Sequence, residues 1–185
     1  MLNSNLLNKI NVNDEWYTQE YAVKPILEFL KPNSTILCPF DKVDSKFVCV
    51  LERNGHKVWN SHIDDGIDFF NYIKSDVDRY DYIISNPPFS KRKQVIEHLF
   101  NLGKPFAMLI PLVSIALKPI REKIDQCELL VFDKRIKFIT YNGIVCKNPP
   151  SETAYICHNV LPKQIVCRKL KEFKNERKNA IKIKN

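Results

Sequence analysis

A rigid corner follows an apolar, strand-like run near the middle of the chain. The letters DYIISNPPF end in Asn86-Pro87-Pro88-Phe89, and a helical pattern follows over 91–102. Proline lacks an N–H, fixes its own φ and biases the residue before it towards extended geometry. We therefore expect the Asn86 side-chain oxygen and the Pro87 carbonyl to face outward and converge on one –NH2 group, with Phe89 offering an apolar face. The corner predicts a pocket for a flat heteroaromatic amine.

Such a pocket suits one kind of chemistry at an exocyclic amine. The amine of adenine is a poor nucleophile, because its lone pair is delocalised into the ring. Two acceptors on its two hydrogens favour a more tetrahedral nitrogen, whose localised lone pair can attack a methyl sulfonium in line. Orientation and electrostatics then suffice, and no strong general base is needed. A plain Pro-Pro turn is the structural alternative.

The pattern of apolar residues places this corner in an α/β fold. Strand-like runs alternate with helical stretches, which is typical of a largely parallel sheet. The strands are almost continuously apolar, which predicts helices on both faces, and the closing run of strands predicts an antiparallel edge hairpin. The expected strands cover 35–40, 56–63, 80–85, 105–112, 127–133, 135–140 and 153–160. The expected helices cover 18–30, 45–54, 91–102 and 120–126, with a tight turn into a short helix over 64–73.

The composition indicates a globular protein of one domain. The chain has 185 residues, of which 44% are hydrophobic, enough for one ordinary core. No apolar run reaches the roughly 18 residues that a membrane span needs. The start lacks the charged region and apolar block of a signal peptide. We therefore expect a cytoplasmic protein with no membrane partner, built as one domain over 1–162.

The positive charge is concentrated at the end of the chain. The net charge is +8, and residues 163–185 hold nine Lys and Arg against two Glu, a local balance of +7. We predict that this stretch is a basic, helical extension. A basic tail indicates an anionic partner such as nucleic acid, and a solvated terminal helix is the alternative.

The cysteines and histidines give no sign of a metal site. None of the six cysteines stands at C-x-x-C spacing, and most lie in apolar, strand-like runs. Buried free thiols are the simplest interpretation. The four histidines form no metal-ligand pattern with the cysteines. We therefore expect no metal.

A resemblance to a known family follows from these motifs. Asn-Pro-Pro-Phe after an apolar strand resembles motif IV of the S-adenosylmethionine-dependent amino-methyltransferases. The stretch 14–27 resembles the segment that packs against the cofactor in adenine-N6 DNA methyltransferases, where an aromatic-Thr pair precedes a helix. The stretch 36–51 resembles the cofactor strand of EcoRI-type adenine-specific methyltransferases and their short phage-like relatives, in which a cysteine, an acidic residue and Ser-x-Phe replace the glycine-rich loop. The stretch 66–70 resembles the family's Asp-Phe pair, whose Asp contacts the cofactor adenine, and 135–138 with 149–157 is similar to its closing hairpin.

The resemblance implies a Rossmann-like methyltransferase fold and an adenine-N6 methyltransferase of DNA. The cofactor would be S-adenosylmethionine, the product S-adenosylhomocysteine, and the target base would be flipped out of the duplex. The implied catalytic residues are Asn86, Pro87, Pro88 and Phe89. The implied cofactor-binding residues are Tyr17, Thr18, Cys38, Pro39, Phe40, Asp41, Ser45, His62, Ile63, Asp68 and Phe69. The residues implied to hold nucleic acid are Lys91, Arg92 and Lys93.

The sequence also departs from the family pattern. No glycine lies between Ile36 and Phe47, and Ser61-His62 stands where an acidic residue usually binds the cofactor ribose. Asp41, Asp44 or Asp65 could take that role, and the sequence does not choose between them.

Ordinary structural roles compete for several of these residues. Thr18, Ser45 and Asp68 could be helix caps, and Phe69 a core aromatic. His62 could be a half-buried strand-end residue, and 91–93 a solvated helix face. Alternative functions are methylation of RNA at adenine N6 or guanine N2, methylation of protein glutamine, and a catalytically inactive nucleic-acid-binding relative.

Overall fold

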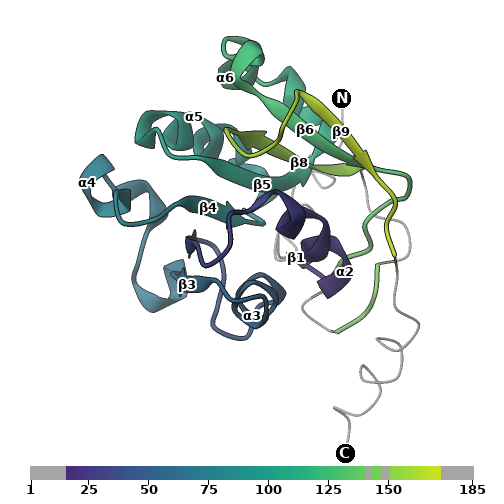
Figure 1. Cartoon of the computed structure of the whole chain (residues 1–185), viewed down its shortest axis with the longest axis horizontal. Coiled ribbons are helices and arrows are strands. Elements are labelled where there is room, and N and C mark those ends of the chain that lie inside the picture. Colours follow the sequence, from purple (N-terminus) through teal and green to yellow (C-terminus); the bar gives the residue numbers. More distant parts are fainter. Residues whose placement is uncertain (1–15, 141–142, 147–150, 172–185) are drawn as a thin grey trace, which may run out of the picture.

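A seven-stranded sheet runs through the middle of the molecule (Figure 1). The computed structural model describes residues 16–140, 143–146 and 151–171. The strand order is β3-β2-β4-β5-β8-β6-β9, and β8 alone runs antiparallel to its neighbours. The predicted α/β class with a mostly parallel sheet is therefore confirmed. The expected antiparallel pair forms between β6 and β8, but it does not lie at the edge of the sheet, because β9 adds a further strand beyond β6. The strands are β2 (Thr35–Cys38), β3 (Lys57–Asn60), β4 (Tyr82–Ser85), β5 (Phe106–Pro111), β6 (Glu128–Phe132), β8 (Thr153–His158) and β9 (Ile165–Arg168).

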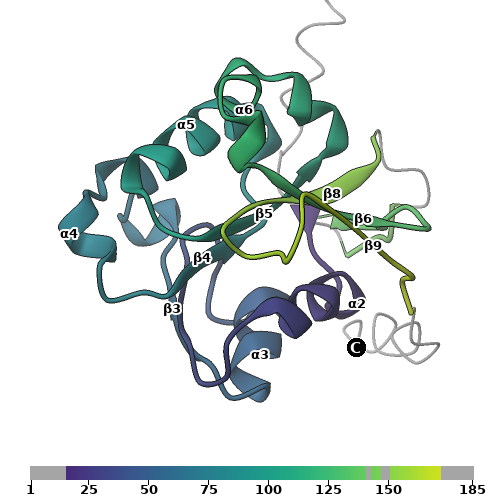
Figure 2. The same cartoon turned by 45° about the horizontal axis from the view of Figure 1, so that its top comes forward.

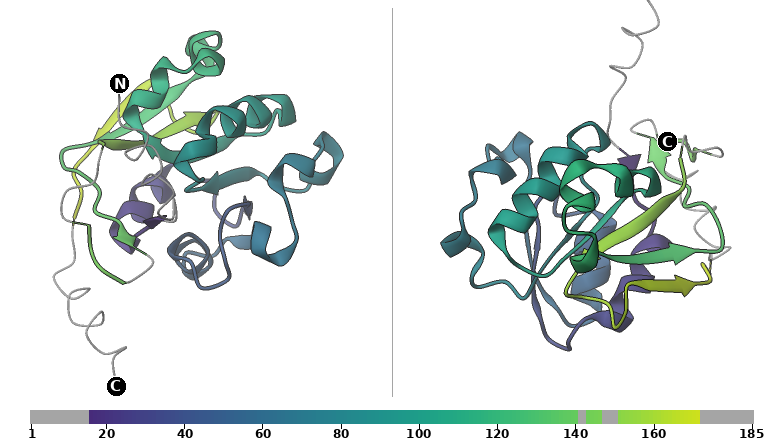
Figure 3. Two further views of the ribbon diagram at one scale, coloured as in Figure 1. Left: turned by 180° about the vertical axis from the view of Figure 1, so that it is seen from behind. Right: turned by 90° about the horizontal axis from the view of Figure 1, so that it is seen from above.

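Helices cover both faces of the sheet, as the apolar strands predicted (Figures 2 and 3). One face carries α2 (Glu20–Val23), the 3-10 helix η1 (Lys24–Phe29) and α3 (Lys46–Arg53); the other carries α4 (Lys74–Val77), α5 (Arg92–Leu102) and α6 (Lys118–Arg121). Strand side chains alternate between the two cores, as period-two geometry requires. Ile36 and Ile84 pack with α3, whereas Leu37 and Ile83 pack with α5. None of the helices in the described ranges is long and apolar enough to cross a membrane.

The order of the first strands creates a topological switch point. After β2 the chain passes through α3 to β3 on one side, and β4 then pairs with the opposite side of β2. Ligands of open parallel sheets bind outside the carboxyl ends of the strands at such a point. The ends of β2 at Cys38 and of β4 at Ser85 lie there.

Three expected elements differ from the structure. The helix expected over 18–30 is the α2 turn followed by η1, because Pro25 lies in the first turn of η1 and cannot continue α-helical hydrogen bonding. The helix expected over 120–126 is α6 followed by the short 3-10 helix η6 (Ile124–Gln126). Of the strand expected over 135–140, only β7 (Ile139–Thr140) forms, and it pairs with β1 (Trp16–Tyr17) outside the main sheet.

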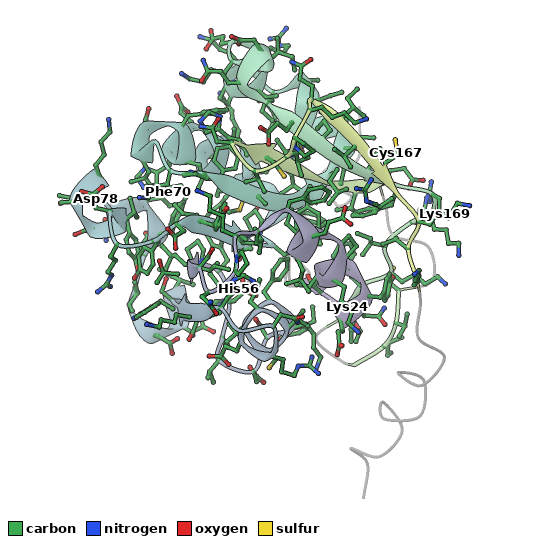
Figure 4. All side chains as sticks on the ribbon, viewed as in Figure 1. Lys24, His56, Phe70, Asp78, Cys167 and Lys169 are labelled. Atoms are coloured by element: carbon green, nitrogen blue, oxygen red, sulfur yellow. The ribbon has the colours of Figure 1, made fainter. Side chains whose placement is uncertain are left out.

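The predicted start of the basic extension, at residue 163, is wrong. Ile165–Arg168 form β9, which runs parallel to β6 at the edge of the main sheet, so the expected boundary at 162 falls inside the fold. Apolar packing holds this segment in the fold, because Val166 and Leu170 are buried against the core of the α2 and α3 face. Cys167 and Lys169 lie at the outer edge (Figure 4). Residues 172–185 lie outside the described residues.

The cysteines are all free thiols in the described structure. Cys38, Cys127 and Cys157 are buried, two others are half-buried, and Cys167 is exposed. Burial raises the pKa of the Cys38 and Cys157 thiols well above the ordinary value. No group of three or more His, Cys, Asp or Glu within the described ranges is placed to hold a metal ion.

The buried hydroxyl of Tyr155 gives a test of how α2 is held. It donates a 2.9 Å hydrogen bond to the carbonyl of Ala22, and so ties β8 to α2. Tyr155→Phe leaves that buried carbonyl without its partner and should lower the free energy of unfolding by roughly 1–3 kcal/mol. Urea denaturation measures the change. Tyr82→Phe is the control, since its hydroxyl accepts only a 3.4 Å contact from the Lys31 N–H; an equal loss in the two variants would contradict this account.

Candidate active site

A cleft of about 370 Å³ opens at the switch point. Its walls come from the segments that follow β2, β3 and β4, and from β1 and β7. These segments are distant in sequence, and the sheet order brings them together. Fourteen predicted site residues line the cleft: Tyr17, Thr18, Pro39, Phe40, Asp41, Ser45, His62, Ile63, Asp68, Phe69, Asn86, Pro87, Pro88 and Lys91.

Four predicted site residues do not line the cleft. Cys38 is fully buried in the core of the α2 and α3 face. Phe89 begins the 3-10 helix η4 (Phe89–Lys91), and its half-buried ring packs edge-on against Phe138, with the ring centres 6.0 Å apart. Arg92 donates a 2.6 Å hydrogen bond to the Phe89 carbonyl. Lys93 is exposed on α5.

Six lining residues were not among the implied catalytic, cofactor-binding or nucleic-acid residues, although one of them, Asp44, was among the three acids considered for the cofactor ribose. Five of them are sequence neighbours of predicted ones, so a wider window around each motif would have included them. Ile139 had no local signal, because it reaches the cleft through the long-range pairing of β7 with β1. The six are Lys42, Asp44, Lys46, Ile67, Phe70 and Ile139.

The Asn-Pro-Pro corner lies outside any helix or strand, and its backbone is extended at Pro88. Pro88 has φ −57° and ψ 126°, and its carbonyl accepts a 3.0 Å hydrogen bond from the Lys91 N–H. Within the described residues no group donates to the Pro87 carbonyl. The side-chain oxygen of Asn86 has no exposed surface, contrary to the expected outward direction. A half-turn of the amide about its last torsion would exchange the oxygen with the nitrogen.

Asp41 is a buried carboxyl group in the wall of the cleft. Its residue is only 7% exposed, and the hydroxyl of fully buried Ser85 donates a hydrogen bond to it. Burial raises the pKa of Asp41 to about 6, and the hydroxyls of Ser85 and Ser45 limit that rise. No Lys or Arg within the described ranges forms an ion pair with it. Asp44 also lines the cleft but is exposed, whereas Asp65 does not line it. Of the three acids considered for the cofactor ribose, only Asp41 and Asp44 therefore border the cleft.

Ser45 has both of the roles that the sequence left open. Its oxygen accepts a 3.2 Å hydrogen bond from the Val48 N–H and so caps α3. Its hydroxyl also interacts with the Asp41 carboxyl group at the cleft. One side chain therefore starts the helix and contributes to the site.

The loop between β2 and α3 does not need glycine. Within the described residues, the only non-glycine residues with positive φ are Asn33 and Asn159, and both lie outside this loop. Every loop residue is therefore in a backbone region that ordinary side chains adopt. The absence of a glycine-rich turn is compatible with a well-formed cleft.

The segment after β3 supplies an apolar wall. Ile63 in η2 (Ile63–Asp65) is 59% exposed, and Ile67 is 43% exposed. Phe69, in η3 (Phe69–Asn71), packs edge-on against Phe40, with ring centres 4.9 Å apart. Asp68 caps η3 by accepting a 3.0 Å hydrogen bond from Phe70 N–H. Ile63 and Ile67 can hold a flat ring, whereas Phe69 is only 2% exposed and belongs to the core on the α5 face of the sheet, which is the structural role that the sequence left open for it. Asp68 keeps its capping role beside them.

His62 is fixed by a local contact at the start of the same segment. It caps η2, and its Nδ1 accepts a 3.1 Å hydrogen bond from the Asp64 N–H. The carboxylate of Asp64, within η2, lies 2.7 Å from Nζ of Lys42, in the loop between β2 and α3. The capping role explains the position of His62, and its ring still lines the cleft.

The start of α5 has an unusual charge. Lys91, Arg92 and Lys93 gather there, and the first turn holds no acidic residue. Cations are unfavourable at the positive end of a helix dipole, whereas an anion there is favourable. Lys91 Nζ also lies 5.9 Å from the centre of the Phe70 ring. The arrangement can receive a phosphate at the edge of the cleft.

Comparison with known proteins adds no family to this geometry. No protein-family model matches the chain. A search of curated proteins also found no match. The chemistry of the cleft is therefore inferred from its own residues.

The raised pKa of Asp41 predicts how stability changes with pH. The ordinary aspartate pKa of 3.8 applies in the unfolded chain, and the folded value is about 6. The folded state thus binds the proton more tightly, and this contribution to stability is lost as pH rises from about 4 through 6. In the ligand-free protein, Asp41→Asn should raise the free energy of unfolding at pH 7 by up to roughly 3 kcal/mol, with little gain at pH 4.

Urea denaturation at the two pH values measures this effect. Asp125→Asn is the matched control, because Asp125 is an exposed carboxylate far along the chain and should change stability little at either pH. A loss of stability at pH 7 in Asp41→Asn would contradict the account of a buried, uncompensated carboxylate.

Proposed function

We propose that the cleft binds S-adenosylmethionine and that the protein methylates the N6 amine of adenine in DNA. The observation that carries the proposal is that the Asn-Pro-Pro corner lines the same cleft as an apolar wall and a buried carboxyl group. When bound, the cofactor would supply an electrophilic methyl group on a sulfonium. The remaining requirements are orientation and electrostatics, which the chain's own residues can meet.

The residues of the cleft fit the chemical groups of this cofactor. Its adenine is a flat ring, for which the exposed side chains of Ile63 and Ile67 offer apolar surface. Its α-ammonium group and its sulfonium each carry positive charge, for which Asp41 offers a buried carboxyl group. A volume of about 370 Å³ falls within the usual range of small-molecule sites.

In this proposal the corner prepares the target amine. The Pro87 carbonyl and the Asn86 side-chain oxygen, after the half-turn of the amide, each accept one hydrogen of the adenine amine. The nitrogen lone pair is then localised and directed towards the methyl group. The prolines hold the two acceptors in place, because each proline fixes its own φ and keeps the residue before it out of helical geometry.

The target base must leave the duplex to reach this corner. Phe89 follows the corner directly, and one edge of its ring is fixed against Phe138. We assign the remaining exposed part of the ring to contact with the flipped base. The cations at the start of α5 would hold the DNA backbone without reading its sequence.

The first test is the reaction itself. The full chain is incubated with methyl-labelled S-adenosylmethionine and DNA, and the DNA is digested to nucleosides. We expect N6-methyladenine from the wild type and a loss of about a hundredfold or more in Asn86→Ala, by analogy with removal of other single hydrogen-bonding groups that act in a transition state. Asn101→Ala is the control, an exposed asparagine at the far end of α5.

Parallel incubations with RNA distinguish the nucleic-acid substrates. Methylated adenine or guanine in RNA, with none in DNA, would replace DNA by RNA as the substrate. Absence of any methylated base with the wild type, or equal product from Asn86→Ala, would contradict the proposed function.

The role of the α5 cations predicts a change in salt dependence. The double substitution Lys91→Gln and Lys93→Gln removes two phosphate contacts, so the slope of log Kd for DNA against log salt should fall by about two. Fluorescence anisotropy with labelled duplex measures it. The charge-matched control is Lys31→Gln with Lys57→Gln, two exposed lysines at the amino ends of β2 and β3. The same reduction in both double variants would contradict a specific role for α5.

A further inference from the structure

Resting on the proposed function, we infer that cofactor binding is coupled to release of a proton from Asp41. A cationic group of the cofactor would enter the cleft beside Asp41, and the carboxyl proton would pass to solvent. Asp41 would then select ligands that carry positive charge at this position. The inference concerns binding alone and does not require that methyl transfer occur.

The position of Asp41 supplies the first reason. The side chain lines the cleft yet is more than nine-tenths buried, between the ends of β2 and β4. The hydroxyl of Ser85 donates a hydrogen bond to it, and the nearby hydroxyl of Ser45 also lowers its pKa, but neither hydroxyl carries a charge. A buried carboxylate without a counter-ion is costly, and proteins usually avoid it by pairing or protonation.

The groups around Asp41 supply the second reason. Behind it, burial raises the pKa of the Cys38 thiol and of the Tyr155 phenol well above their ordinary values, so both are neutral near pH 6. No lysine or arginine in the described part of the chain forms an ion pair with Asp41. The missing positive charge can therefore come from a ligand. Besides Asp41, the ionisable side chains that line the cleft are Tyr17, Lys42, Asp44, Lys46, His62, Asp68 and Lys91.

The hydrogen bond between Ser85 and Asp41 links this event to the reaction site. Ser85 is the last residue of β4, and Asn86 follows it directly. An ionised carboxylate accepts only, and its hydrogen bonds from hydroxyls are stronger than those of the neutral acid. A ligand cation that ionises Asp41 would thus strengthen the tie between the β2–α3 loop and the Asn-Pro-Pro corner. We expect cofactor to bind before the target base.

The experiment is calorimetry on the full chain at pH 5, 6 and 7, in buffers of different ionisation enthalpy. With a carboxyl pKa of about 6, S-adenosylmethionine should bind about tenfold more weakly at pH 5 than at pH 7, with release of close to one proton at pH 5. S-adenosylhomocysteine keeps the ammonium but lacks the sulfonium, so coupling with this ligand assigns the cation to the ammonium. 5′-Methylthioadenosine lacks both cations and should show no coupling.

Variants separate Asp41 from the other groups. Asp41→Asn should abolish the coupling and equalise the affinity for S-adenosylmethionine at pH 5 and 7. Asp125→Asn, which changes an exposed carboxylate outside the cleft, should keep the coupling. If Asp41→Asn does not fold, the ¹³C resonance of the Asp41 carboxyl group replaces it: its titration midpoint near pH 6 should fall when S-adenosylmethionine is added.

The outcomes distinguish this inference from the proposed function. Binding of S-adenosylmethionine with no proton release, or coupling that persists in Asp41→Asn, overturns the inference and leaves the proposed cofactor in place. A ¹³C resonance of the Asp41 carboxyl group whose titration midpoint does not change when the cofactor binds would also overturn the inference and leave the proposed cofactor in place. Absence of binding at millimolar ligand at every pH overturns both.

Discussion

The hydrogen bond from Ser85 to the buried Asp41 joins the two strands that flank the switch point of the sheet. Ser85 ends β4, and Asp41 follows β2 in the loop that leads to α3. This contact fixes the Asn-Pro-Pro corner relative to the opposite wall of the cleft. It also places a carboxyl group where burial makes its charge costly, so the geometry of the site depends on how that charge is balanced.

The stability of the fold and the chemistry of the site make opposite demands at this point. A neutral side chain at position 41 would suit the ligand-free core, because it would remove the cost of a buried charge. A carboxyl group at the same place suits a cationic ligand. Ser45 shows a milder combination of roles, since the hydroxyl that caps α3 also lies against Asp41. The β2–α3 loop, which contains no glycine, thus contributes both to the stability of the fold and to the candidate site.

The sequence predicted the features that short-range patterns determine. The parallel strands, α3, α5 and the extended corner follow from apolar periodicity and from proline, which act within a few residues. The features it missed depend on contacts between distant segments. Ile165–Arg168 form a strand only because β6 offers an edge, and Ile139 reaches the cleft only because β7 pairs with β1. Likewise, the Phe89 ring packs against Phe138, about fifty residues away in the chain, and the burial of Asp41 depends on packing between distant segments, which the sequence alone does not show.

We propose above all that the cleft beside the Asn-Pro-Pro corner is the binding site of a nucleoside cofactor. The most direct test of this binding site is a crystal structure determined from crystals of the protein soaked with S-adenosylhomocysteine. We expect density for the adenine against Ile63 and Ile67, with the amino-acid end nearer Asp41 and the sulfur facing Asn86. Density for the ligand elsewhere on the molecule, or an empty cleft at millimolar ligand, would contradict the account.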